Sequence, residues 1–192
     1  MTSTRRMGSL DSEKATTMLD AAEKILTESG YAALTSRRVA EQLGVKQRLV
    51  YYYFRTMDDL VLETFKRLSE RDLRRLKEGV ASDRPLYEIW DVFINTSDSR
   101  IVAEFMALAN HHEELRKEVI HFIEEARKIQ IRALKKAMKN TASDTEGLSA
   151  EAIALVGSSL ALALNRETLL GVSLGHSATH KMVKQFFQRL QD

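Results

Sequence analysis

The most informative stretch of the chain spans residues 35–54 and reads TSRRVAEQLGVKQRLVYYYF. It contains two short segments with apolar residues at helical spacing, separated by Gly44. Thr35 or Ser36 is a good N-cap for the first segment, and the glycine ends that segment after barely two turns. Two short helices joined by a tight turn that contains glycine form a helix-turn-helix, and the pattern predicts this motif here.

The second helix of the motif is expected from about Lys46 to Tyr53, and its two faces differ. Apolar side chains share one face, namely those of Val45, Leu49, Val50 and Tyr53. Long polar side chains share the other, namely those of Gln47, Arg48, Tyr51 and Tyr52. A helix with such donors on its free face can enter a major groove, where Arg pairs with guanine and Gln with adenine. A helical hairpin inside an unrelated bundle would give the same pattern.

The charges around this motif are also unevenly distributed, although the whole chain carries a net charge of only +2. Between Arg37 and Arg55 there are five basic residues and one acidic residue, Glu41. A local basic patch is the electrostatic footprint of a phosphate-binding surface, and it is also common on ordinary helical surfaces.

The rest of the 192-residue chain has the composition of an all-α protein. It contains one proline and eight glycines, and 44% of its residues are hydrophobic, which favours long helices joined by short turns. A first helix is expected from Asp11 or Ser12 to the glycine at position 30. About nine helices are expected in all, the later ones over about 57–79, 85–94, 98–112, 113–139, 149–172 and 177–190.

Several classes of protein have no support in the sequence. The chain has no cysteine, which excludes disulfides and thiolate metal sites and fits a reducing cytoplasm. It shows no signal peptide and no apolar run long enough to cross a bilayer, so no membrane association is expected. No nucleophile motif or phosphate loop is present, and we expect no enzymatic activity, no catalytic residue, no cofactor and no metal.

Over residues 11–65 the sequence resembles the TetR (tetracycline repressor) family of bacterial transcriptional regulators. The shared features are a first helix that ends at glycine, a following threonine, an A-x-x-x-G-V turn, a Y-x-H-F ending and an acidic-Leu start to the fourth helix. They correspond here to Gly30, Thr35, residues 40–45, residues 51–54, and Asp58-Asp59-Leu60. The departures are Lys46, Arg48, Tyr53 and Met57, which replace Ser or Thr, a small residue, His and Lys.

The resemblance implies that the chain binds double-stranded operator DNA as a homodimer, most often as a repressor, in the cytoplasm. Thr35, Ser36 and Tyr51 would then hold phosphates, while Lys46, Gln47 and Arg48 would probe the groove. The expected DNA-binding residues also include Arg37 and Tyr52, which share this surface. Arg5 and Arg6 could add a basic arm in a minor groove, or belong to a solvated tail.

The resemblance also divides the chain into a DNA-binding domain, residues 1–56, and a larger helical domain for ligand sensing and dimerisation, residues 57–192. Residues 150–164 are apolar or small on nearly all sides, so this helix should be buried on more than one face, as in a dimer. A small, mainly apolar effector is expected between the middle helices. Candidate ligand-binding residues, each also explicable as plain core, are Trp90, Phe93, Phe105, Met106, Asn110, Phe122 and Asn165.

A helical di-iron-type metal-binding bundle is the alternative. Glu118-x-x-His121 has the spacing that such bundles use, and further histidines lie nearby. That site needs a second Glu-x-x-His motif, which the sequence lacks, so the regulator remains the preferred hypothesis.

Overall fold

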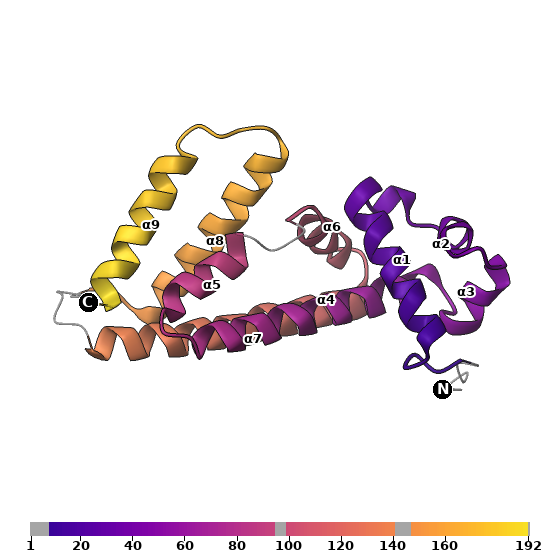
Figure 1. Ribbon diagram of the computed structural model, residues 1–192, viewed down its shortest axis with the longest axis horizontal. Helices are drawn as coiled ribbons and strands as arrows, with labels where there is room; N and C mark the ends of the chain where they lie inside the picture. Colours follow the sequence, from indigo (N-terminus) through magenta and orange to yellow (C-terminus); the bar gives the residue numbers. More distant parts are fainter. Residues whose placement is uncertain (1–7, 95–98, 141–146, 192) are drawn as a thin grey trace. The chain divides into compact units, whose positions relative to one another are not determined.

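The computed structural model describes residues 8–94, 99–140 and 147–191. All regular structure within these residues is helical, which confirms the all-α prediction (Figure 1). The elements in chain order are α1 (Glu13–Ser29), the 3-10 turn η1 (Tyr31–Ala33), α2 (Ser36–Leu43), α3 (Gln47–Tyr53), α4 (Met57–Val80), α5 (Pro85–Ile94), α6 (Ser99–Ala109), α7 (Glu113–Asn140), α8 (Ala150–Leu169) and α9 (His176–Gln191).

The chain divides into two compact units. The first comprises Met1–Leu68 and Arg100–Val119, and the second comprises Ser69–Ser99 and Ile120–Asp192. Helices α4 and α7 therefore each begin in the first unit and continue into the second. The expected division into a DNA-binding domain, residues 1–56, and a ligand-sensing domain, residues 57–192, is a division by function and differs from these compact units. It stays a prediction.

The first unit is built on the amphipathic helix α1. Ser12 caps this helix by accepting a hydrogen bond from the backbone of Ala15 at 3.2 Å, as the sequence predicts. The buried face of α1 consists of Ala15, Met18, Leu19, Ala21, Ala22, Ile25 and Leu26. Helix α2 packs against α1 and α3 packs against α2, so the short helices share one apolar core with the long one.

Two glycines fix the turns between these helices. Gly44 has φ +65° and ends α2, and the backbone N–H groups of Gly44 and Val45 donate to the carbonyls of Glu41 and Ala40. This is a Schellman motif, which needs a left-handed residue at the position of Gly44. Gly30 has φ +77° after α1, and the carboxylate of Glu104 on α6 lies against it and accepts a hydrogen bond from the backbone N–H of Tyr31.

The second unit has its own core between α5, α7, α8 and α9. Pro85 opens α5, whose Leu86, Ile89 and Trp90 are buried against residues of α7, α8 and α9. The indole ring of Trp90 lies edge-on to the ring of Phe187 on α9, with centroids 6.3 Å apart. Burial of these large side chains, at about 25 cal/mol per Å² of apolar surface, is the main stabilisation of this unit.

The structure corrects the sequence analysis at α8 and α9. Helix α8 ends at Leu169 rather than near residue 172, because Gly171 has φ +79° and leaves the helix. In the last helix, Val183, Phe187 and Leu190 are buried in the core of their own unit. Met182 alone among the exposed large apolar side chains of the described chain belongs to α9.

We expect the two turn glycines to differ in their tolerance of alanine. A Cβ at Gly44 meets no atom within 4 Å, so Gly44→Ala should lower the free energy of unfolding only by the cost of a left-handed alanine, about 1–2 kcal/mol. Gly30 has φ +77° and ψ 175°, a conformation almost restricted to glycine, and a Cβ there lies 2.7 Å from the Glu104 carboxylate, so Gly30→Ala adds a clash to a larger backbone strain. Urea unfolding should show the larger loss of stability for Gly30→Ala, and equal losses would contradict this account of the two turns.

Candidate nucleic-acid interface

Helix α3 is held by its inner face. Val50 and Tyr53 are buried, and Phe54, which follows the helix, is fully buried. The three side chains belong to the core of the first unit, and Val50 and Tyr53 lie on the apolar face that the helical spacing of the sequence predicts. The orientation of the helix is therefore set by packing, and its opposite face is left for solvent or a partner.

The outer face of α3 carries the predicted polar residues. Gln47 and Arg48 are exposed, and Tyr51 and Tyr52 are 45% and 38% exposed although both have large rings. Lys46 is the N-cap residue of α3 and is also exposed. Such a row of long donors beside aromatic rings is able to contact the base edges and phosphates of a nucleic acid.

A hydrogen-bond network beneath this face connects α2 to α3. The Ser36 hydroxyl is buried, with the residue 4% exposed, and it donates to the Tyr51 hydroxyl at 3.0 Å. The same oxygen accepts a hydrogen bond from Nε2 of Gln47 at 2.7 Å. In the structure the Ser36 side chain is hydrogen-bonded to two residues of α3. The phosphate contact that the family resemblance implies for Ser36 stays a prediction. Ser36 and Tyr51 are 15 residues apart, and the sequence does not predict their contact because it depends on how α2 and α3 pack.

The basic residues of the motif differ in their partners. Arg37 is exposed and donates through Nε to Glu41 at 2.7 Å. This hydrogen bond and the charge of Glu41 raise the pKa of Arg37 above its ordinary value. Arg38 donates to the hydroxyl of Ser29 at the end of α1 at 2.8 Å. A surface ion pair such as Arg37–Glu41 is weak and can exchange for a phosphate contact.

The segment before α1 reaches the end of α3. A Cβ at Gly8 would lie 2.5 Å from the ring of Tyr53 and 2.7 Å from the ring of Tyr52, so the backbone there is in close contact with both rings. The rings of Tyr52 and Tyr53 also meet edge-to-face at 5.0 Å. The backbone of the same chain at Gly8 therefore already contacts the Tyr52 ring. Arg5 and Arg6 lie outside the described residues.

The candidate ligand-binding residues are spread over both units. Phe105 is buried in the first unit with its ring 5.0 Å from that of Phe65. Met106 follows it on α6, and Asn110 follows the end of that helix. Trp90, Phe122 and Asn165 belong to the second unit. The side chain of Phe93 lies outside the described residues.

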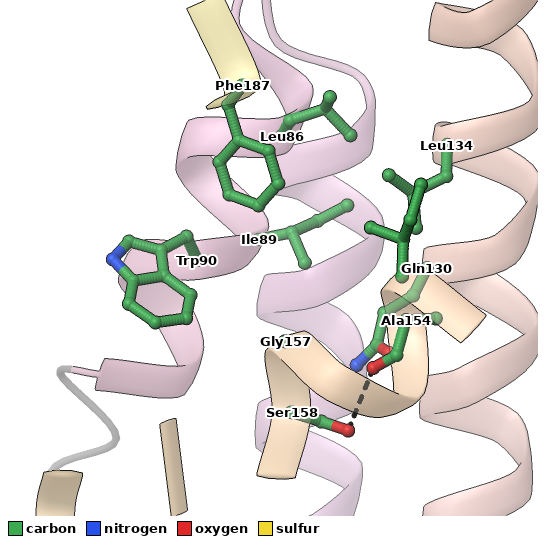
Figure 2. Close-up of a pocket in the computed structure, with 10 residues that line it drawn as sticks. Leu86, Ile89, Trp90, Gln130, Leu134, Ala154, Gly157, Ser158 and Phe187 are labelled. Atoms are coloured by element: carbon green, nitrogen blue, oxygen red, sulfur yellow. Dashed lines mark hydrogen bonds between the residues drawn. The ribbon is translucent and has the colours of Figure 1, made fainter. Parts of the chain in front are cut away.

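Trp90 lines a cavity of about 30 Å³ inside the second unit. Figure 2 shows the side chains of its wall, which come from α5, α7, α8 and α9. The wall also includes Gln130 on α7, which the sequence analysis did not select as a ligand-binding residue.

In the described part of the chain, the His, Asp and Glu side chains form no group of three or more that could hold a metal ion. None of the helices in these ranges is long and apolar enough to cross a membrane.

Comparison with known proteins places this motif in a family. Residues 18–64 match the family of bacterial regulatory proteins described as the tetR family. This segment, which includes α2 and α3, is thus similar to the tetR family. A curated relative, the fatty acid metabolism regulator protein of Bacillus subtilis (strain 168), is 29% identical over 63 residues. That match covers 33% of this chain and 32% of the relative, so this chain aligns with only about a third of the relative's length.

Solved structures extend the likeness to nearly the whole fold. A putative transcriptional regulator from Saccharomonospora viridis, solved in complex with choline, has a TM-score of 0.80 at 16% identity and covers 92% of this chain and 96% of its own. A TetR transcription regulator from Haloarcula marismortui ATCC 43049 has a TM-score of 0.75 at 20% identity, with 92% and 97% coverage. The chain thus has the domain and the fold of a tetR-family transcriptional regulator, which does not favour the metal-binding alternative.

We expect Arg48 and Tyr51 to make different kinds of contact with DNA. Arg48→Ala should cost about 1–3 kcal/mol on a preferred duplex and relax the preference at one base position. Tyr51→Phe removes one neutral hydroxyl and should weaken binding to all duplexes about equally, by about 0.5–1.5 kcal/mol. Fluorescence anisotropy with a set of single-base operator variants measures both effects.

Salt dependence decides whether Arg48 contacts a base or a phosphate. A phosphate-bound arginine lowers the slope of log affinity against log salt concentration by about one unit when it is removed. Uniform weakening of Arg48→Ala across the duplexes, together with that change in slope, would exclude the base contact.

Proposed function

We propose that this protein is a ligand-responsive transcriptional repressor that binds operator DNA in the cytoplasm as a homodimer. The observation that carries the proposal is the exposed polar face of α3, held in place by a buried inner face and by the Ser36 network. A rigid helix with aligned donors loses little conformational entropy on binding, which suits it to reading a groove.

DNA contacts are assigned by position in the motif. The first turn of α2 contains Ser36 and Arg37 after the cap residue Thr35, and N–H groups at a helix start favour phosphate oxygens. Lys46, Gln47 and Arg48 lie at the start of α3, from which side chains reach base edges in a major groove. Tyr51 and Tyr52 lie one turn further along α3, and we assign them to phosphates of the DNA backbone.

Helix α8 supports the dimer. Its buried residues Ala150, Ala154, Ala161 and Leu164 face the core, and the opposite face exposes large apolar side chains. Leu155 and Val156 are 53% and 64% exposed, and Leu162 on the same side is also exposed. A helix that is apolar on both faces needs a second partner for the outer one, and a second copy related by twofold symmetry presents the same surface.

The turn after α8 continues this exposed apolar surface. Leu169 at the end of α8 is exposed, and so are Leu170, Val172 and Leu174, which lie between α8 and α9. Together with Leu155 and Val156 they form an apolar surface longer than a single isolated side chain, which is the usual sign of an interaction site.

A dimer also fits the geometry of operator DNA. Two recognition helices related by a twofold axis read half-sites about one helical turn apart, so ligand-driven changes in their separation alter DNA affinity. Choline in the regulator from Saccharomonospora viridis is an example of a small ligand bound to a protein of this fold. For this chain we propose a small, mainly apolar effector.

The variant Val156→Glu tests the dimer and its link to DNA binding. Val156 is 64% exposed in the single chain, so the carboxylate leaves the subunit core intact. In the proposed interface the charge loses its hydration, so we expect the dimer to weaken by more than 100-fold, by the cost of several kcal/mol for burying an unpaired charge. Sedimentation velocity should show that the variant is monomeric. The variant should also bind DNA duplexes of random sequence more weakly than the wild type at low salt.

Gln188→Glu is the matched control, because it adds the same charge at an exposed position of α9. This variant should stay dimeric and retain DNA. An unchanged dimer for Val156→Glu would overturn the assignment of the interface. A monomeric wild-type protein that binds duplexes equally well would overturn the homodimer itself.

A further inference from the structure

The cavity of the second unit contains a hydrogen-bond acceptor without a partner. Gln130 of α7 is 4% exposed, and its Oε1 atom has no hydrogen-bond partner. Figure 2 shows its side chain beside Ala154 and Ser158 of α8, in the wall that also contains Leu86, Ile89 and Leu134. A buried polar group without a partner is rare in folded proteins and requires an explanation.

The hydroxyl of Ser158, which lies in the same wall, does not satisfy this oxygen. The Ser158 hydroxyl has one hydrogen, which it donates to the carbonyl oxygen of Ala154. The distance between the two oxygen atoms is 2.9 Å (Figure 2). The Ser158 oxygen also accepts a hydrogen bond from Nη2 of Arg127 at 3.1 Å. With its only donor engaged, Ser158 leaves the Gln130 acceptor for a molecule inside the cavity.

We propose that this cavity is the effector site, and that its ligand is a small, uncharged, mainly apolar molecule that donates one hydrogen bond to Oε1 of Gln130. This inference rests on the regulatory function proposed above. The wall contains Leu86, Trp90, Ile153 and Phe187, and it has no charged side chain. An ionic ligand would lose its hydration there without compensation, whereas an alcohol, phenol or N–H group gains a partner.

The size of the cavity links ligand binding to a change in conformation. Its volume of about 30 Å³ is enough for water, which needs about 10–15 Å³, but an apolar cavity that holds benzene has about 150 Å³. An aromatic ligand must therefore widen the space between α5, α7 and α8. Gly157 of α8 lines the same wall, and a Cβ at this position would meet no atom within 4 Å. The ligand thus binds the conformation with the wider space more tightly than the one described here. Regulation requires such a difference in affinity between two conformations.

Calorimetry of the full-length protein with phenol, anisole and toluene tests the chemistry of the site. The three probes have similar size, but only phenol donates a hydrogen bond. We expect the ratio of phenol affinity to toluene affinity to be about 5- to 100-fold larger in the wild type than in Gln130→Leu, which lacks the acceptor. Gln130→Met, which is closer in shape, should behave like Gln130→Leu.

The variants carry their own control for folding. Removing a buried unpaired acceptor should leave the resistance to urea unchanged or increase it. Lys136→Leu introduces leucine at an exposed position of α7 and should keep the wild-type ratio of affinities. The same ratio in the wild type and Gln130→Leu, tighter binding of anisole than of phenol, or no binding of any probe would each overturn the proposal.

The role as effector is measured separately on DNA. Saturating phenol should change the affinity of the wild type for duplex DNA, and DNA should change phenol affinity by the same factor. Phenol binding without this coupling would overturn the effector role. A wild-type protein that binds no duplex in the absence of phenol would instead contradict the proposed function, whatever the cavity binds.

Discussion

The structure depends on the anchoring of a helix that is too short to be stable alone. Helix α3 has seven residues, whereas isolated helices below about 12–15 residues are marginal in water. Val50, Tyr53 and the following Phe54 fix it to the core of the first unit, and the Ser36 hydroxyl joins it to α2. Because burial on one side supplies the stability, the other side can keep polar residues that add nothing to folding. The same division leaves the outer face of α3 available for the donors that the proposed DNA contacts require.

The second unit has two features that one chain cannot satisfy, and they differ in physical kind. The outer face of α8 exposes Leu155 and Val156, whose burial depends on area and has no preferred direction. Oε1 of Gln130 is a single buried acceptor, and a partner must approach it with a donor in a narrow range of angles. The first feature suits a second copy of the chain and the second suits a small molecule. A regulator needs both, because dimer geometry is the property that the ligand must change.

Local signals predicted the helices and their ends. Ser12 and Thr35 cap α1 and α2, and Gly44 ends α2 in a Schellman motif, since each of these depends on residues within one turn. Contacts between distant residues were not predicted, such as that of Glu104 with Tyr31 across 73 residues, or the burial of Ser36 under Tyr51. The sequence did contain one signal for Gln130, a polar residue next to Ile129 on the apolar face of α7, but it gives no indication that the acceptor lacks a partner.

Selection of duplexes from a random pool by the full-length protein tests most directly whether α3 reads bases as part of a symmetric dimer. The retained duplexes, sequenced after several rounds, should contain an inverted repeat whose half-sites are about 10 base pairs apart, or a multiple of that spacing. Exchange of Gln47 and Arg48 for alanine should remove the preference within each half-site while leaving the spacing. A pool that shows no enriched sequence, or one enriched in a single half-site without a symmetric partner, would contradict this description of the protein.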